Sequence, residues 1–180
     1  MSNNRKSVRL AKMGMLVAVS IVLVYFIHFP IIPVLPFLEY DPADIPILMG
    51  TFAFGPLGGI ALTAVTAVVQ GVTVSAGSGV YGILMHIIAT GTFVLVAGTI
   101  YKRNKTRKGA VIALVAGTAA MAAIMAPANI IITPIFMGLE RAVLIDTFLW
   151  PIVGFNIIKA GINSVVTFIL YKRISGFLHK

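Results

Sequence analysis

The sequence predicts an all-α membrane protein, and three observations support this prediction. Hydrophobic residues make up 59% of the 180 residues and charged residues only 11%, against about 25% in an ordinary soluble domain. A soluble fold of this length could not hide so much apolar surface, since a small domain leaves much of its surface in water. Long apolar runs alternate with basic clusters. The lipid bilayer is therefore the expected solvent, and a soluble enzyme, a disordered chain and a nucleic-acid-binding protein are excluded.

The first expected helix covers roughly residues 10–28 and follows a basic N-terminus. A basic stretch before an apolar run can also open a signal peptide. Here no small-residue cleavage site follows the run, which leads instead into Phe29-Pro30. We therefore expect the run to remain in the protein as its first membrane-spanning helix.

Five further helices are expected, in one membrane domain over residues 1–180. Three have the roughly 20 apolar residues that a spanning helix needs, and they cover roughly 80–101, 109–133 and 149–171. The apolar stretch 43–74 is broken by Phe54-Gly55-Pro56-Leu57-Gly58-Gly59, and Pro with paired Gly marks a turn. It is therefore divided into shorter helices over roughly 43–54 and 57–72.

The charges support six crossings of the membrane. Basic clusters precede the first helix, separate the fourth from the fifth, and follow the sixth. The five acids, Glu39, Asp41, Asp44, Glu140 and Asp146, lie in or beside the loops after the first and fifth helices. Six crossings place every basic cluster on one face and every acid on the other, whereas five crossings, or one bent helix over 43–74, would not. The positive-inside rule then predicts that both termini are cytoplasmic.

The sequence contains no constellation that indicates catalysis. It has no Walker pattern and no His-Glu-x-x-His pattern, so neither ATP hydrolysis nor a zinc site is expected. It has no cysteine, and its three histidines are scattered. We therefore expect no catalytic residue, no metal site and no cofactor, and binding or transport remains.

The strongest functional signal is a polar stripe in the last helix. Lys159 lies about 15 Å from the start of that helix, near the middle of the bilayer, where a charge is costly and usually functional. Asn156 and Asn163 share its helical face, and no carboxylate lies in the same helix. The stripe would suit a flat polar ligand with an imide or carbonyl edge. The alternative is that Lys159 snorkels to the interface and the asparagines join helices.

Other candidate residues give weaker signals. Asn129 near the outer end of the fifth helix is either a ligand contact or an interhelical hydrogen bond, and Gln70 and His86 favour the second role. In the first outer loop, Leu38 and Tyr40 could cover an outward-facing ligand pocket, although an interfacial aromatic belt also explains Tyr40.

Two further features concern structure and partners. Asp44 is expected to cap the second helix. Small residues at Ala11, Gly14 and Ala18 lie on one face of the first helix and allow another helix to approach closely. That face could pack inside the protein or against a partner.

Four stretches resemble the substrate-binding S component of energy-coupling factor (ECF) transporters, most closely the riboflavin-specific type. The similarity covers nearly the whole chain and involves the loop into the second helix, the turn after it, and the segments around the fifth and sixth helices. These stretches are Tyr40–Pro46, Phe54–Gly59, Thr133–Gly138 and Phe155–Gly161.

The resemblance implies a high-affinity riboflavin-binding subunit in the bacterial plasma membrane. Such a subunit works with a membrane T component and two ATPases, whose ATP hydrolysis drives vitamin uptake. Asn129, Asn156 and Lys159 would hydrogen-bond the flavin, and the first outer loop would close over it. The face with Gly14 and Ala18 would dock the T component. An S component for another vitamin or flavin, and a membrane scaffold without a ligand, remain the alternatives.

Overall fold

The computed structural model describes residues 2–33, 35 and 38–179, and its fold is all-helical, as the composition predicts. The long elements are α1 (Ser2–Phe26), α4 (Gly79–Arg103), α5 (Arg107–Met137) and α7 (Leu149–His179). Two shorter helices, α2 (Asp44–Phe54) and α3 (Pro56–Val72), follow the first loop. Short helical turns are η1 (Ala76–Ser78), α6 (Arg141–Val143) and η2 (Leu144–Phe148). Strands are limited to β1 (Phe29–Pro30) and β2 (Glu39–Tyr40) among the described residues.

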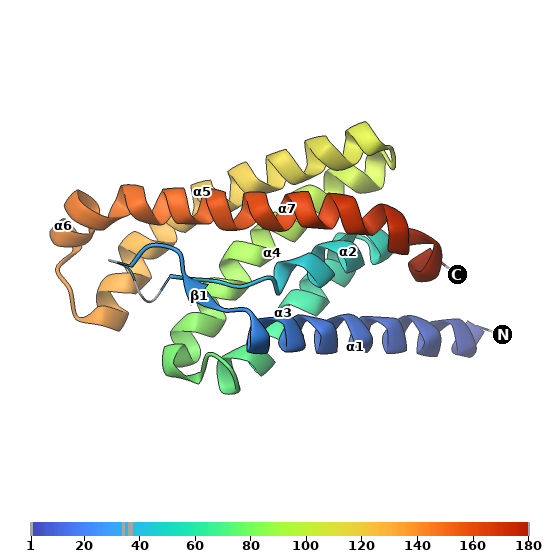
Figure 1. Ribbon diagram of the computed structural model, residues 1–180, viewed down its shortest axis with the longest axis horizontal. Coiled ribbons are helices and arrows are strands. Elements are labelled where there is room, and N and C mark those ends of the chain that lie inside the picture. The colour runs from blue at the N-terminus through green and yellow to red at the C-terminus, as the bar shows by residue number, and fades with distance from the viewer. Residues whose placement is uncertain (1, 34, 36–37, 180) are drawn as a thin grey trace.

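Four helical stretches are long and apolar enough to cross a membrane, namely Lys6–Phe26, Ala76–Arg103, Arg107–Met137 and Arg141–Tyr171. In Figure 1, both termini and the turns after α2 and α4 lie toward one end of the bundle. The loop between α1 and α2, η1 and α6 lie toward the other end. We call these the basic end and the loop end, since the Lys and Arg clusters fall at the first.

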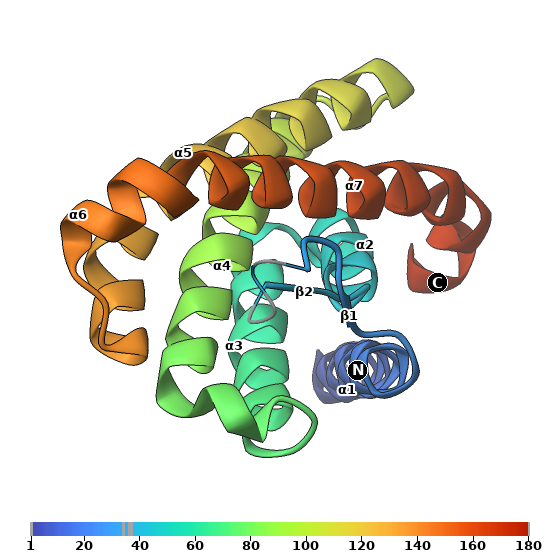
Figure 2. The same cartoon turned by 60° about the vertical axis from the view of Figure 1, so that its left-hand side comes forward.

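The break between α2 and α3 follows from two residues. Gly55 has φ +84°, a conformation that side chains with a Cβ rarely adopt, and Pro56 occupies the first turn of α3. The helix α2 is short, yet all its residues from Asp44 to Phe52 are buried. A helix that is apolar on every side belongs in the interior of a bundle, and α2 lies there with helices around it (Figure 2).

The fifth and sixth helices are longer than the sequence predicts. The helix α5 continues past Pro134 to Met137 and ends at Gly138, whose φ of +66° suits a helix terminus. The last helix was expected from residue 149, but the chain is already helical from Arg141. A proline removes only its own N–H donor and one partner carbonyl, and Pro134 is buried inside the helix.

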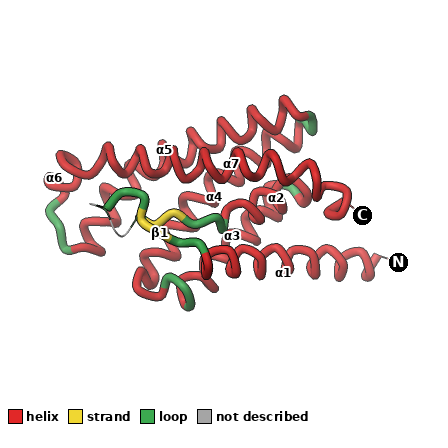
Figure 3. Tube along the Cα trace, in the orientation of Figure 1, coloured by secondary structure: helices red, strands yellow, loops and turns green. Residues whose placement is uncertain are grey.

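The core joins α2, α4, α5 and α7, with Phe93 fully buried at its centre. A Cβ on Gly117 would clash with the Phe93 ring, so α5 can approach α4 only with glycine at this position. Large apolar side chains cover much of the outer surface, as expected for helices in contact with lipid. Figure 3 shows that the loops connect the helix ends while β1 and β2 pair across the first loop.

Candidate ligand-binding site

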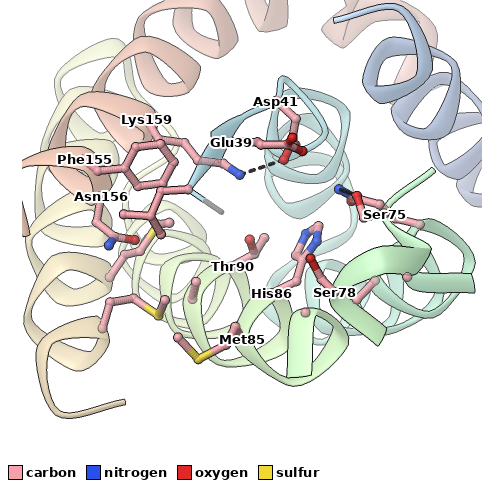
Figure 4. A pocket seen from close by; sticks show the side chains of 18 residues that line it. Glu39, Asp41, Ser75, Ser78, Met85, His86, Thr90, Phe155, Asn156 and Lys159 are labelled. Carbon is pink, nitrogen blue, oxygen red and sulfur yellow. Dashed lines mark hydrogen bonds and ion pairs between the residues drawn. The ribbon is translucent and has the colours of Figure 1, made fainter. Parts of the chain in front are cut away.

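A cavity lies at the loop end between the first loop and helices α3, α4, α5 and α7 (Figure 4). Its polar lining comprises Glu39, Asp41, Gln70, Ser75, Ser78, His86, Thr90, Asn156 and Lys159. Its larger apolar lining comprises Leu38, Met85, Met121, Met125 and Phe155. Segments from the first loop to α7, including the connection with η1, therefore contribute to one site, which places amide and ammonium groups among sulfur-containing and aromatic side chains.

The Lys159 ammonium forms an ion pair with Asp41, with 2.8 Å between Nζ and Oδ2. Both side chains are largely buried, at 15% and 7% exposed. The sequence analysis found no carboxylate in the same helix, and the partner comes instead from the loop, 118 positions earlier. Lys159 therefore neither snorkels to the surface nor lies alone. It ties the first loop to α7 and also faces the cavity (Figure 4).

The charge state of Asp41 follows from its surroundings. Burial alone would raise the pKa of this carboxyl, but the Lys159 ammonium and His86 act more strongly together and hold the pKa below its usual range. Asp41 Oδ1 also accepts a hydrogen bond from the Ala43 backbone N–H at 3.0 Å. The ionised form is thus favoured, and Asp41 and Lys159 face each other as a carboxylate and an ammonium.

Asp44 does not cap α2, contrary to expectation. The N-cap residue is Ala43, without a side-chain cap, and the Asp44 carboxylate points into the bundle. It accepts hydrogen bonds from Thr90 Oγ1 at 2.7 Å and from Asn163 Nδ2 at 3.3 Å. Interhelical partners in a buried environment outcompete the local cap, because a buried carboxylate needs several donors.

Asn163 and Tyr40 belong to the same buried network. Asn163 is fully buried, donates also to the Asp41 carbonyl at 3.2 Å, and accepts from the Tyr40 hydroxyl at 3.1 Å. Neither residue lines the cavity. Burial also raises the pKa of Tyr40, so its hydroxyl remains a donor. The structure thus separates the predicted stripe into two parts, with Asn163 holding the loop while Asn156 and Lys159 face the cavity.

The two remaining asparagines differ in position. Asn156 donates to the Ile152 carbonyl of its own helix at 2.8 Å and contributes to the cavity wall. Asn129 is buried and bonded within α5, donating to the Met125 carbonyl and accepting from Thr133, each at 2.8 Å. Asn129 is not among the cavity-lining residues.

Two polar atoms in the cavity wall have no hydrogen-bond partner among the described residues. They are Gln70 Oε1 and His86 Nε2, both buried, the latter 3.7 Å from Asp44 Oδ1. Sequence reasoning favoured an interhelical hydrogen-bonding role for these side chains over contact with a ligand. Gln70 and His86 meet at the cavity because α3 packs against α4, and the spacing of residues within one helix cannot predict this packing.

The small residues of α1 lie on the surface. Ala11, Gly14 and Ala18 are all exposed, and a Cβ on Gly14 would meet nothing within 4 Å. Only 17% of the apolar window of α1 is buried, against 39–44% in the other three candidate spans. The face therefore does not serve packing within the chain.

Comparisons with known proteins converge on one family. Residues 8–171 match the family described as ECF transporter, substrate-specific component. The chain is 32% identical to "Riboflavin transporter RibU" of Staphylococcus aureus (strain TCH60), over 99% of this chain and 96% of that protein. It is 28% identical to "Riboflavin transporter FmnP" of Bacillus subtilis (strain 168), over 80% of each chain.

A solved structure is similar to the whole fold. It is described as "Structure and mechanism of the S component of a bacterial ECF transporter", and the TM-score is 0.84 at 31% identity. The alignment covers 97% of this chain and 99% of that one.

Proposed function

The chain belongs to the substrate-specific components of ECF transporters, and from this membership we propose that it captures riboflavin in the cavity beside Lys159. The family binds transported substrates, so the chain is a membrane transport protein and not an enzyme. The observation that carries the proposal is the cavity itself, in which Asn156 and Lys159 face apolar side chains. The names of the relatives, riboflavin transporters, support the same ligand.

The chemistry of riboflavin matches this lining. The isoalloxazine ring has apolar faces and an imide edge of alternating donors and acceptors. Met85, Met121 and Phe155 would cover the faces, and the Asn156 amide with the Lys159 ammonium would bind the edge. The ribityl hydroxyls would supply the partners that Gln70 Oε1 and His86 Nε2 lack.

The other predicted site residues would cover the ligand, hold the loop, or contact the ligand only after a change in their hydrogen bonds. Leu38 lies in the cavity wall and would cover the ligand. Tyr40 and Asn163 would hold the loop in place through their hydrogen bonds. Asn129 remains a proposed flavin contact by resemblance to the family, and it would have to exchange its bonds within α5 for the ligand.

We propose that six helices cross the bacterial plasma membrane with both termini in the cytoplasm and the cavity facing outward. The arrangement of the ends in Figure 1 and the positive-inside rule support this orientation. The exposed face with Ala11, Gly14 and Ala18 would dock the membrane T component, which joins the chain to two ATPases. The proposed partners are therefore riboflavin, these subunits and the bilayer.

The charge of the cavity favours riboflavin over its phosphate ester. The Lys159 ammonium is already neutralised by Asp41, and Glu39 adds a negative charge to the lining. A dianionic phosphate would have to be buried without a free cation, which is costly. We therefore expect riboflavin to bind more tightly than flavin mononucleotide.

Fluorescence titration tests the proposed function. Riboflavin fluorescence should be quenched saturably, at one site per chain, when the purified protein is added in detergent. Thiamine and biotin, whose rings differ in shape and edge chemistry, should not compete at equal concentration. Absence of saturable quenching, or equal competition by these vitamins, would contradict the proposal.

A further inference from the structure

Two cavities adjoin one another at the basic end of the bundle and share the side chain of Phe168. The first, which we call the basic cavity, has a volume of about 350 Å³ and is lined by Phe52, Tyr101, Lys105, Thr106, Arg107 and Ala110, with Phe168, Ile169 and Tyr171. The second, which we call the α5–α7 groove, has a volume of about 340 Å³. Neither belongs to the proposed riboflavin site, which lies at the loop end.

The basic cavity combines two cations with a mainly aromatic and aliphatic lining. Lys105 and Arg107 lie in its wall with exposed side chains. The first turn of α5 begins at Arg107, and although Thr106 caps it by accepting the Gly109 N–H at 3.0 Å, the positive end of this helix adds to the two cations. No carboxylate lies in the described lining. An anion entering there would meet attraction from three sources and repulsion from none.

The α5–α7 groove is apolar and faces the lipid side of the bundle. Its lining consists mainly of Val111, Leu114, Val115, Val165 and Phe168. Its two polar side chains, Thr118 and Ser164, are hydrogen-bonded to each other at 3.3 Å, so they need no polar ligand. A Cβ on Gly161 would meet nothing within 4 Å. Figures 1 and 2 show α5 and α7 diverging toward the basic end, where the groove lies.

We propose that these two cavities together bind one anionic phospholipid. Its headgroup phosphate would lie between Lys105, Arg107 and the start of α5, and one acyl chain would fill the groove beyond Phe168. A lipid fits because the first cavity carries two cations among aromatic side chains, and the second, which shares Phe168 with it, is apolar. A helix from a partner protein fits less well. It has no compact anionic group, such as a phosphate, to place between the two cations.

The test uses the full chain in detergent with phosphatidylglycerol or phosphatidylcholine of identical acyl chains. Native mass spectrometry should show about tenfold more phosphatidylglycerol than phosphatidylcholine bound, because each nearby cation contributes to anionic-lipid binding. The Lys105→Gln/Arg107→Gln variant should lose this preference. The Gly161→Leu variant should bind less of both lipids, because the new side chain occupies the groove.

Two control variants test whether the loss of any exposed cation, or the addition of any side chain on α7, changes lipid binding. Arg141→Gln removes an exposed cation at the other end, and Gly154→Leu adds a side chain at an α7 glycine with equally open space outside both cavities. Both should bind lipid as the parent does. Riboflavin quenching provides the folding control for every variant, since none of these residues lines the flavin cavity.

Three results would overturn the assignment. The first is equal binding of the two lipids by the parent. The second is unchanged lipid binding in both Lys105→Gln/Arg107→Gln and Gly161→Leu, which would leave the cavities to another occupant such as a partner helix. The third is complete displacement of phosphatidylglycerol by millimolar inorganic phosphate, which would make this a site for free phosphate.

Discussion

The two ends of the bundle place their charges in opposite ways. At the loop end, Asp41, Asp44 and Lys159 are buried and satisfied by ion pairs and hydrogen bonds. At the basic end, residues 102–108 carry five cations that are all exposed and have no carboxylate nearby in sequence. Buried charges must be paired because removing an ion from water is costly, whereas exposed cations beside a membrane remain free to interact with anions.

The contrast also concerns rigidity. The buried network at the loop end fixes the first loop through Asp41, Tyr40 and Ala43, which bond to α7 or to one another. The Ser20 hydroxyl adds a bond from α1 to the Ala43 carbonyl at 3.0 Å. Charge at this end therefore holds one wall of the candidate cavity in place, whereas the cations at the basic end are exposed. Substitutions at the two ends should differ accordingly.

The largest effect is expected from Asp41→Asn. This change leaves the Lys159 ammonium buried without its partner, which should lower the free energy of unfolding by about 3 kcal/mol. Denaturant or thermal unfolding in detergent measures the loss. The double variant Asp41→Asn/Lys159→Met should recover part of it, because the unpaired charge is removed.

The neighbouring acid provides the control for this change. Glu39 is exposed and forms no ion pair among the described residues. The free energy of unfolding of Glu39→Gln should therefore equal that of the parent. If Asp41→Asn were as stable as Glu39→Gln, the ion pair would not hold the loop and the contrast between the two ends would fail.

A smaller loss is expected from Thr90→Val, which keeps the shape of the side chain but removes the 2.7 Å bond to the Asp44 carboxylate. A hydrogen bond to a charged group contributes about 2 kcal/mol. Thr63→Val is the matched control, since this buried threonine donates to the Gly59 carbonyl of its own helix at 2.9 Å and to no other described residue. Equal stability of the two variants would show that the hydrogen bond from Thr90 of α4 to the Asp44 carboxylate does not stabilise the fold.

Lowering the pH tests the contribution of the Asp41 carboxylate to stability. Its pKa lies below the ordinary value because Lys159 and His86 outweigh the effect of burial. The ion pair therefore contributes fully above the ordinary aspartate pKa of about 4 and is lost as the pH falls through the lower pKa of the folded state. The stability difference between the parent and Asp41→Asn should be constant from pH 7 to 5 and shrink below about pH 4. A difference that already shrinks between pH 7 and 5 would mean that the carboxyl is not held ionised.

The smallest effect is expected at the basic end. Lys102→Gln and Arg103→Gln remove exposed charges at the last turn of α4. Because these side chains remain in contact with solvent, their removal should leave the unfolding midpoint unchanged within error. A clear loss of stability in either variant would show that this end also depends on paired charges.

The all-helical fold could be predicted from the sequence because apolar composition and turn residues are local properties. The break at Gly55-Pro56 is an example, since both residues act on their own backbone. The extension of α5 past Pro134 was missed, because a proline ordinarily marks a helix end, whereas this helix continues through buried Pro134 to Met137.

The candidate site was predicted only in part. Lys159 and Asn156 were identified because a charge and an amide share one face of a helix at membrane depth. The partner of Lys159 could not be predicted, since Asp41 lies in a loop whose path depends on the whole bundle. For the same reason Asp44 was assigned to a local cap, although Thr90 and Asn163 bind it across the core.

Riboflavin titration of two adjacent α7 variants tests the central claim most directly. Asn156 lies in the cavity wall, whereas Ile157 is half exposed on the outer surface. Asn156→Ala should weaken riboflavin binding about tenfold, as expected for one lost hydrogen bond in a buried site, and Ile157→Ala should bind as the parent does. Equal affinity of the two variants, with both folded, would contradict the placement of the flavin in this cavity.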